Sequence, residues 1–375
     1  MNSLTEAKRI QNIELSLLRR IMAAAAPDAL DLALGELTYP LPQPLAKHAG
    51  KLLLTETPRY TPNAGLPALR NQVAAYYDHQ TDESRVCITN GAEEALFVTL
   101  TALVNDGDLI AIPDPDYPAY PALATMVNAR IVRLPYKHDL ITIDWDQWAS
   151  LLAKGVKFLL FSHPANPHGR FFSDNEIERL INICARNGIV LIVDEIYREL
   201  YFAQKPLSFA GRYDHLIVIG GLSKSHCMSG WRIGWITSPL SIAPAMIKTR
   251  QYVSTCSNWL SQMLAIYALS TDGLKLIASI RKRLRDNCRS AIGFIKDRFT
   301  PEGSETPSTH RITTIHSPDA TPYIMIETGG DDVAYAIELA QRGIITAPGT
   351  AFGNLTRGWI RINASALDAP PKDQK

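Results

Sequence analysis

Residues 215–237 read HLIVIGGLSKSHCMSGWRIGWIT, an apolar run followed by a lysine and, eight positions later, an arginine. The apolar residues 216–219 predict a buried strand, and the turn 220–223 places Lys224 at the end of that strand. A buried ammonium group is costly unless it is paired or neutralised, so most loop lysines lie on the surface. Lys224 is therefore either an ordinary surface residue or part of a binding site.

The neighbours of Lys224 favour a site that holds a phosphate group. Gly220, Gly221 and Ser223 are small, which lets another group approach the backbone closely. Arg232 adds a planar cation that suits a phosphate. A lysine beside a phosphate site is what pyridoxal 5'-phosphate (PLP) requires, because this cofactor attaches to its enzymes through a Schiff base.

The same stretch resembles the lysine signature of the class I/II aminotransferases, the fold-type I PLP-dependent enzymes similar to aspartate aminotransferase. That signature is roughly Ser-x-Ser-Lys-(Ser/Thr)-x-x-x-x-Gly-x-Arg-x-Gly, and it is matched by Ser223, Lys224, Ser225, Gly230, Arg232 and Gly234. The resemblance implies that Lys224 is the Schiff-base lysine. It also implies that the cofactor phosphate contacts Ser223, Ser225 and Arg232. Gly221 stands where the family often has a further serine, so one hydroxyl contact falls to Ser223 or Ser225.

Composition excludes several classes of protein. The chain has 375 residues, of which 46% are hydrophobic, enough for a large core in two or three domain-sized units. A net charge of +1 gives no field that favours nucleic acid or a membrane surface as a partner. No apolar run reaches transmembrane length, and the polar N-terminus is unlike a signal peptide.

Spacing of the cysteines, histidines and glycines excludes several kinds of site. The five cysteines are scattered, which predicts free thiols and a cytoplasmic protein. No HExxH or CxxC spacing occurs, so no metal site is expected. Ser223 precedes Lys224 where a P-loop needs glycine, and no GxGxxG follows a predicted strand.

Strands that alternate with helices predict an α/β fold with a mostly parallel sheet and a site at the strand ends. We expect strands at 86–89, 108–113, 156–162, 189–193, 216–219, 323–326 and 359–363, helices at 3–24, 173–187, within 241–299 and at 331–342, and a polar loop at 300–318. The resemblance implies the PLP-dependent transferase fold type I. In that fold a large domain holds a mostly parallel sheet of the seven-stranded type between helices, and a smaller domain is α+β.

The resemblance also implies how the chain divides. We expect an N-terminal arm at 1–44 that joins the small domain, a large PLP-binding domain at 45–275 and a small C-terminal domain at 276–375. Relatives usually add another helix after the sequence DAPPKDQK, so we expect a shortened edge of the small domain there.

Three further motifs resemble cofactor contacts of the family. The backbone amides of Ala92 and Glu93, at a strand–turn–helix junction, are expected to hold the phosphate. Tyr117 is expected to stack on the pyridine ring, with Tyr120 as support. The resemblance implies that Tyr60 reaches the cofactor phosphate of a neighbouring subunit, which predicts a homodimer. Without the resemblance, Tyr60 would be interpreted as an ordinary aromatic residue in a turn.

The remaining motifs supply the ring contacts and the substrate contacts. Asp194 ends an apolar strand, where a carboxylate is expensive to bury unless a pyridinium nitrogen pairs with it; the alternative is a helix cap. The resemblance implies that Asn166 and Tyr197 bond the phenolic oxygen, and that Lys224, Asp194 and Tyr197 are the catalytic residues. For the substrate, the resemblance implies contacts from Gly35, from Asn166 and from Arg361, whose guanidinium binds the α-carboxylate in a bidentate pair.

Some residues depart from the family pattern near the expected substrate. Residues 36–39 read Glu-Leu-Thr-Tyr in place of the common Glu-Pro-Asp-Phe. His163 and His168 replace an asparagine and a threonine, and each is either ordinary loop chemistry or a specialised acid or base. Glu93 stands where some relatives that bind dicarboxylates have lysine. It is either an acid that complements the helix dipole or a group that disfavours a second carboxylate and suits a cationic side chain.

The expected reaction is transfer of an amino group from an α-amino acid to a 2-oxo acid. The alternative is a PLP-dependent elimination or cyclisation, lyase-like or cyclodehydratase-like, on a specialised amino acid, with a cationic side chain as one option. A ligand-sensing regulator would carry an added basic DNA-binding domain, and the first 30 residues lack that pattern. An inactive relative is disfavoured because Lys224, Asp194 and Arg361 are all present.

Overall fold

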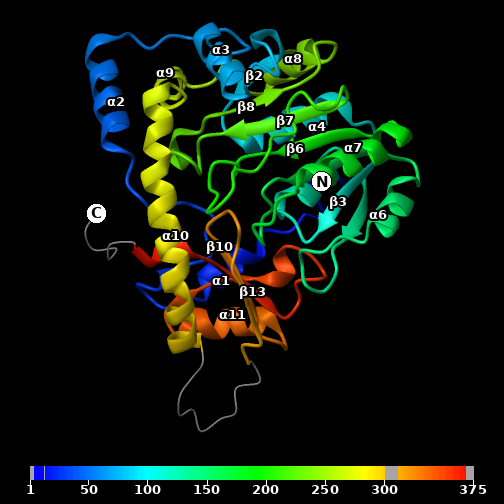
Figure 1. Ribbon diagram of the computed structural model, residues 1–375, viewed down its shortest axis with the longest axis vertical. Coiled ribbons are helices and arrows are strands. Elements are labelled where there is room, and N and C mark those ends of the chain that lie inside the picture. Colours follow the sequence, from blue (N-terminus) through cyan, green and yellow to red (C-terminus); the bar gives the residue numbers. More distant parts are fainter. Residues whose placement is uncertain (1–3, 12, 300–310, 369–375) are drawn as a thin grey trace.

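The structure is a computed structural model that describes residues 4–11, 13–299 and 311–368. Its centre is a seven-stranded sheet in the order β2-β8-β7-β6-β5-β3-β4 (Figure 1). Strand β8 is antiparallel to both of its neighbours, and the other neighbouring pairs are parallel. The strands are β2 Val86–Thr89, β3 Leu109–Asp114, β4 Arg130–Pro135, β5 Val156–Ser162, β6 Val190–Asp194, β7 Leu216–Gly221 and β8 Gly234–Thr237. The predicted α/β fold with a mostly parallel sheet is confirmed.

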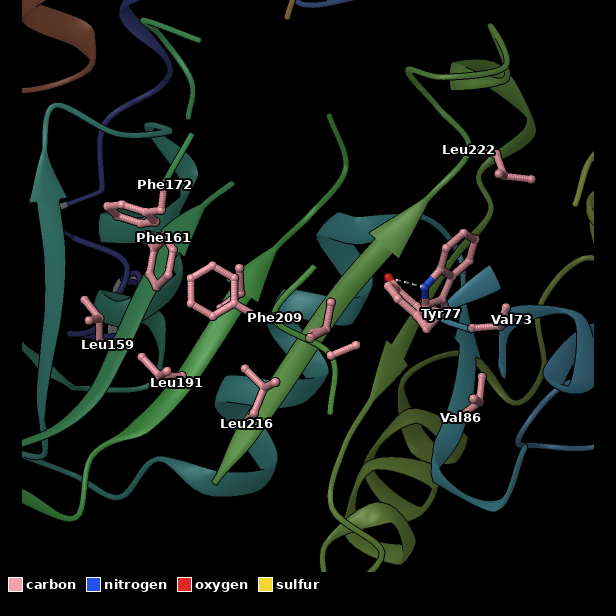
Figure 2. Packing of buried hydrophobic residues seen from close by; sticks show 14 of the residues in the cluster. Val73, Tyr77, Val86, Leu159, Phe161, Phe172, Leu191, Phe209, Leu216 and Leu222 are labelled. Carbon is pink, nitrogen blue, oxygen red and sulfur yellow. Dashed lines mark hydrogen bonds between the residues drawn. The ribbon is translucent and has the colours of Figure 1, made fainter. Parts of the chain in front are cut away.

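Side chains of the sheet alternate between two core clusters, one on each face. On β5, for example, Phe161 belongs to one cluster and Phe158 to the other. Because both faces are buried, these strands read as continuous apolar runs in the sequence. In the first cluster the rings of Phe161, Phe172 and Phe209 pack edge to face in one group, which Figure 2 shows.

Helices cover both faces of the sheet and contribute to the two clusters. The first face packs against α2 Gln43–Thr55, α3 Pro67–Tyr76, α6 Trp145–Leu152, α7 Asp174–Asn187 and α9 Trp259–Ala268. The second packs against α4 Ala92–Leu103, α5 Ala119–Met126 and α8 Ala243–Ser254. The bounds of α7 agree with the helix predicted at 173–187. A capping box between Ser173 and Glu176 starts α7, and Gly188, with a φ of 65°, ends it.

A smaller unit lies beside the large sheet, in the lower part of Figure 1. Its four-stranded antiparallel sheet has the order β12-β13-β10-β9, and a separate two-stranded sheet pairs β1 with β11. The elements of this unit are β1 Leu30–Asp31, β9 Thr314–His316, β10 Tyr323–Glu327, α11 Asp332–Gln341, β11 Ile344–Ile345, β12 Ala347–Pro348 and β13 Trp359–Asn363. The described part of the chain also has short 3₁₀ helices, which are η1 Glu83–Arg85, η2 Ser229–Trp231, η3 Gly349–Ala351 and η4 Ala364–Asp368.

One long helix, α10 Thr271–Phe299, runs alongside both units (Figure 1). The boundary expected at residue 275 therefore falls inside a continuous helix. At the N-terminal end of the chain, α1 Leu17–Ala23 and the parallel pairing of β1 with β11 attach the first residues to the smaller unit, where Ile21 packs with Ala336 and Ala340.

Two element predictions need correction. The helix expected at 3–24 is observed over Leu17–Ala23 only, and the side chains of Leu4 and Leu15 are exposed, so no packed face stabilises helix before residue 17. Within the expected loop 300–318, residues 314–316 form the edge strand β9, whose partly exposed position explains its polar sequence. Residues 300–310 of that loop and the last residues, 369–375, where a shortened edge was expected, lie outside the described part.

Within the described ranges, no single helix is both long and apolar enough to cross a membrane. The bent pair α9 and α10, which meet at 81°, passes that test of length and composition only when the two are joined.

Candidate active site

The carboxyl ends of the parallel strands meet around one cavity of about 850 Å³. The loops that follow β3, β5, β6 and β7 line it together with the N-terminus of α4, and residues of the smaller unit and of segment 34–36 also line it. Ligands of open parallel sheets bind at this edge. Lys224, Asp194 and Arg361, which belong to three separate sequence motifs, all line this cavity.

Lys224 follows β7, and its Nζ donates a hydrogen bond to the carbonyl oxygen of Gly35 at 2.6 Å. The glycines before it serve the packing of β7 on β8. A Cβ on Gly220 would lie 2.5 Å from the indole nitrogen of Trp235, so a side chain at that position would displace the neighbouring strand. The close approach that the sequence predicts at these glycines is therefore made by the protein itself, and it fixes the strand that carries Lys224.

Asp194 ends β6 with its carboxylate buried beside the cavity. Its oxygens accept hydrogen bonds from the Tyr120 hydroxyl at 3.1 Å and from the Ile196 N–H at 3.1 Å. Burial raises the pKa of Asp194 to about 7, because these two donors compensate only part of the lost hydration. A cationic ring nitrogen in the cavity would supply the missing compensation. The contact of Tyr120 with Asp194 was not foreseen from the sequence.

The N-terminus of α4 forms an anion site at another part of the cavity. Ala92 and Glu93 start this helix after Gly91, and the first N–H groups of a helix have no acceptor inside it. Arg232 donates to the backbone carbonyl of Asn90 in this turn and to that of Ser229, and a Cβ on Gly91 would lie 2.7 Å from its Nη2. Gly234 packs against the same turn, where a Cβ would lie 2.7 Å from the Gly91 carbonyl carbon. Free amides, the helix dipole and a guanidinium together suit a phosphate.

Arg361 lies on the opposite side of the cavity with its guanidinium almost fully buried. Its Nη1 donates to Asn166 Oδ1 at 2.8 Å and its Nη2 to the Ala33 carbonyl at 2.6 Å, while Nε is buried without a partner. The guanidinium carbon stands 4.0 Å from the centre of the Tyr323 ring and 4.6 Å from that of Phe352. This arrangement leaves a planar cation with hydrogen-bonding capacity to spare, which a carboxylate would satisfy.

Tyr197 and Tyr323 form a pair of hydroxyl groups in the cavity. Their oxygens are 2.7 Å apart, and both residues are buried. Burial, followed by the neighbouring Tyr323, raises the pKa of Tyr197 well above its usual range, so Tyr197 keeps its proton. Tyr197 was predicted as a site residue, but Tyr323 was predicted only as part of a strand.

Two carboxylates lie at the rim of the cavity. Glu36 accepts a hydrogen bond from the Ser229 hydroxyl, and Glu93 accepts one from the Tyr117 hydroxyl at 3.3 Å. Loss of hydration raises the pKa of Glu93, and the hydrogen bond from Tyr117 partly opposes that rise. Tyr117 itself lines the cavity and meets the Tyr120 ring edge to face at 5.4 Å.

Not all predicted residues come together around the cavity. Ser223 lines it, but Ser225 is turned toward His226, 2.8 Å from its Nδ1. Tyr60 is 89% exposed and lies outside the cavity of its own chain. His163 is buried between Phe172, on which it stacks, and the Leu207 carbonyl, 3.1 Å from its Nε2.

His168 is also buried away from the cavity, with its ring against Tyr136. Burial lowers the pKa of His163 to about 3 and the pKa of His168 well below its usual range. Both rings are therefore neutral near pH 7, and both pack as core side chains.

The residues around the cavity fit PLP. The anion site at α4 suits its phosphate, the under-compensated carboxylate of Asp194 suits its ring nitrogen, and Lys224 lines the same cavity. Asn166 and Tyr197 present an amide and a hydroxyl to the same space. Nη1 and Nη2 of Arg361 each make one hydrogen bond inside the protein, so one N–H on each remains for a substrate carboxylate.

Comparisons with known proteins identify the family of the chain. Residues 27–370 match the family model described as aminotransferase class I and II. A probable aspartate aminotransferase of Methanocaldococcus jannaschii is 27% identical over 369 residues, which cover 95% of this chain and 94% of that protein. A probable N-acetyl-LL-diaminopimelate aminotransferase of Bacillus subtilis is 28% identical over 377 residues, with 96% and 91% covered.

The fold is also that of solved structures. A single mutant of Thermus thermophilus aspartate aminotransferase superposes with a TM-score of 0.87 at 21% identity, over 97% of this chain and 96% of that one. The family model spans nearly the whole chain, and the chain therefore belongs to the aminotransferase class I and II family. It is a PLP-dependent aminotransferase.

Proposed function

From this membership we propose that the protein moves an amino group from an α-amino acid to a 2-oxo acid with Lys224 as the residue that carries the cofactor. The observation that supports this most is that Lys224, Asp194 and Arg361 line one cavity, although they lie in three distant parts of the chain. An amine, a ring-nitrogen partner and a carboxylate clamp are the groups that this chemistry needs in one place.

Each wall of the cavity has a defined task in this proposal. When bound, PLP supplies the aldehyde that takes up the amino group and the electron-withdrawing ring that weakens the bonds at Cα. The α4 N-terminus, Ser223 and Arg232 would hold its phosphate, and Tyr117 would cover its ring. The carboxylate of Asp194 would keep the ring nitrogen protonated, while Asn166 and Tyr197 would bond the phenolic oxygen.

The protons are moved by residues of the chain. The Lys224 amine is placed to remove the proton at substrate Cα and to return it on the cofactor side, as a general base and then a general acid. Arg361 binds the α-carboxylate and orients Cα, and its hydrogen bond to Asn166 fixes the guanidinium plane. The carbonyl of Gly35 holds the Lys224 ammonium in the cavity between these events.

We propose further that the substrate has no second carboxylate. Among the described residues that line the cavity, the cations are Lys224, Arg232 and Arg361, and each already has a role. The carboxylates of Glu36 and Glu93 stand at the rim, where they would repel a distal carboxylate and suit a neutral or cationic side chain. Aspartate, after which several relatives are named, would then be a poor substrate of this chain.

Elimination or cyclisation is the second candidate reaction, and its support is weaker. It drew on His163 and His168 as specialised acids or bases, and neither ring lies among the described residues that line the cavity. The departures at residues 36–39 do reach the site, because Glu36 lines it.

We also propose a homodimer in which Tyr60 reaches the neighbouring subunit. Tyr60 is 89% exposed, and the large apolar side chains of Leu53, Leu54 and Tyr252 are exposed as well. The proposal predicts complementation: mixing Tyr60→Ala subunits with Lys224→Ala subunits restores activity, because one site of a mixed dimer has both residues. Two variants that stay inactive after mixing and refolding together would contradict it. The cytoplasmic location remains a proposal, in keeping with the five free thiols.

A single-turnover experiment tests the reaction and the substrate class together. The purified enzyme is mixed with individual amino acids, without a 2-oxo acid, while absorbance follows the cofactor and mass spectrometry identifies the product. Conversion of the cofactor to pyridoxamine phosphate with release of a 2-oxo acid is the expected result. Loss of water or ammonia from the substrate with an unchanged cofactor would instead establish elimination or cyclisation.

A further inference from the structure

One hydroxyl inside the cavity has no role so far, that of Tyr323 on β10. The residue is 1% exposed, and its Oη lies 2.7 Å from Tyr197 Oη and 3.4 Å from the Gly35 carbonyl oxygen. We infer that Tyr323 is a positioning residue that donates its proton to Tyr197 and thereby leaves the Tyr197 proton for the phenolic oxygen of the cofactor. The inference rests on the proposed place of the cofactor beside Lys224 and Tyr197.

The direction of this hydrogen bond follows from counting protons. Each tyrosine hydroxyl has one proton to donate, and an anionic phenolic oxygen can only accept. If Tyr197 donated to Tyr323, it would have no proton left for that oxygen. The other acceptor open to Tyr323 is the Gly35 carbonyl, but that bond is long, and Lys224 Nζ already approaches the same oxygen at 2.6 Å. In the order Tyr323 to Tyr197 to cofactor, Tyr323 donates at 2.7 Å and the Tyr197 proton stays available for the phenolic oxygen.

The position of the Tyr323 hydroxyl is fixed from several sides. A side chain at Gly35 would collide with it, so that glycine leaves the room that the hydroxyl needs. The ring meets the Tyr197 ring edge to face at 5.5 Å and supports the Arg361 guanidinium at 4.0 Å. Tyr323 therefore cannot turn away from Tyr197 without disturbing the carboxylate clamp.

A donated hydrogen bond makes Tyr197 a better donor in turn, because bonded hydroxyls polarise one another. A stronger bond to the phenolic oxygen draws negative charge from it. When that oxygen carries less negative charge, it stabilises the proton on the nitrogen that joins Lys224 to the cofactor less strongly. Tyr323 therefore lowers the pH at which that nitrogen loses its proton.

The test is a pH titration of the visible absorption band of the cofactor-loaded enzyme. Tyr323→Phe keeps the ring under Arg361 and removes only the hydroxyl, and we expect the midpoint to rise by about 0.5 pH unit. Tyr197→Phe should raise it further, and the double variant should match Tyr197→Phe alone. Tyr335→Phe is the matched control, since it removes a buried hydroxyl that donates to the Phe299 carbonyl outside the cavity; its midpoint should stay at the wild-type value.

An unchanged or lowered midpoint in Tyr323→Phe overturns the inference, and so does a double variant whose shift is the sum of the two. If Tyr323→Phe fails to fold, 3-fluorotyrosine at position 323 keeps the hydroxyl and makes it a stronger donor, so the midpoint should fall; a midpoint that stays or rises contradicts the inference. Failure of the proposed function is separate. If the cofactor does not attach at Lys224, wild-type enzyme shows no band that borohydride fixes there, and if the reaction is not transamination, the single-turnover experiment shows it while the titration of the band is unaffected.

Discussion

The inner wall of the cavity and its rim are held by the fold to different degrees. The inner wall, which comprises Asn166, Asp194, Tyr197, Tyr323 and Arg361, is buried to at least 95%, and its polar atoms bond one another across the two units. The rim, which comprises Leu34, Glu36 and Glu93, is half-buried or exposed, and the carboxylates of Glu36 and Glu93 each accept a hydrogen bond from one hydroxyl group. We therefore propose that the wall carries the chemistry common to the family and that the rim sets the substrate.

The largest effect is expected when Lys224, which lines the same cavity as the inner wall, is replaced. Lys224→Ala removes both the attachment of the cofactor and the general base, so turnover should fall by about 10⁴-fold or more. Borohydride reduction followed by peptide mapping should place the cofactor on Lys224 in the wild type and nowhere in the variant. Lys248→Ala, an exposed lysine on α8, is the control and should keep full activity. An adduct that persists in Lys224→Ala would place the cofactor on another residue.

Replacement of Asp194 tests whether the inner wall is arranged for a ligand at the expense of the free energy of unfolding. The native pKa of about 7 exceeds the unfolded value of 3.8, so Asp194 stays protonated to a higher pH in the native state than in the unfolded chain. The contribution of Asp194 to the stability of the cofactor-free protein should therefore fall as pH rises from about 4 to about 7, by about 4 kcal/mol in the limit, while Asp116 and His163 contribute their own pH dependence in both wild type and variant. Asp194→Asn should remove this dependence and be more stable than wild type at pH 7, while binding PLP more weakly.

Denaturant unfolding of both cofactor-free proteins at several pH values checks this. The control is Asp297→Asn, which changes an exposed aspartate on α10 and should leave the pH dependence as in wild type. Parallel curves for wild type and Asp194→Asn across pH 4 to 7 would show that the carboxylate is compensated inside the protein.

Replacement of Arg361, which belongs to the inner wall, should reduce activity by an intermediate amount. Arg361→Lys keeps the charge but loses the planar fork, so kcat/KM should fall by about 10²-fold for every amino acid. The loss should be uniform across side chains because the α-carboxylate is common to all substrates. The control is Arg342→Lys, which changes an exposed arginine of the smaller unit that is paired with Glu338. A loss confined to some side chains would move Arg361 from the α-carboxylate to the specificity pocket.

The charged residues of the cavity were easier to predict from the sequence than the hydrogen bonds that hold the site together. Lys224, Asp194 and Arg361 each stand in a local pattern, such as a charged residue that ends an apolar run. The bonds that support them join distant residues, 126 positions apart for Tyr197 and Tyr323 and 74 for Tyr120 and Asp194, and such pairs leave no spacing in the sequence.

Strands β2, β3, β5, β6 and β7 of the large sheet were predictable because both faces are buried, which makes apolar runs. Strands β4 and β8 were not predicted; β4 lies at the edge of the sheet, and most of its side chains are partly exposed. The predicted N-terminal helix was wrong before residue 17 because periodicity does not show whether a partner face exists, and the side chains of Leu4 and Leu15 are exposed. The roles open to His163 and His168 could not be decided from sequence for the same reason: burial against Phe172 and Tyr136 depends on the fold.

The smallest effect, and the one that bears most on the rim, is expected at Glu93. Glu93→Gln removes a charge at the cavity mouth while keeping the size of the side chain and an acceptor for Tyr117. The ratio of kcat/KM for aspartate to that for a neutral amino acid should rise about five- to tenfold, and the ratio for arginine should fall. Because the pKa of Glu93 is raised, wild-type enzyme should reject aspartate more strongly as pH increases through that pKa, and the variant should lose this trend. Glu178→Gln, an exposed residue on α7, should change neither ratio. If Glu93→Gln also leaves both ratios unchanged, Glu93 serves the helix dipole of α4 alone, and specificity must come from Glu36 or from a neighbouring subunit.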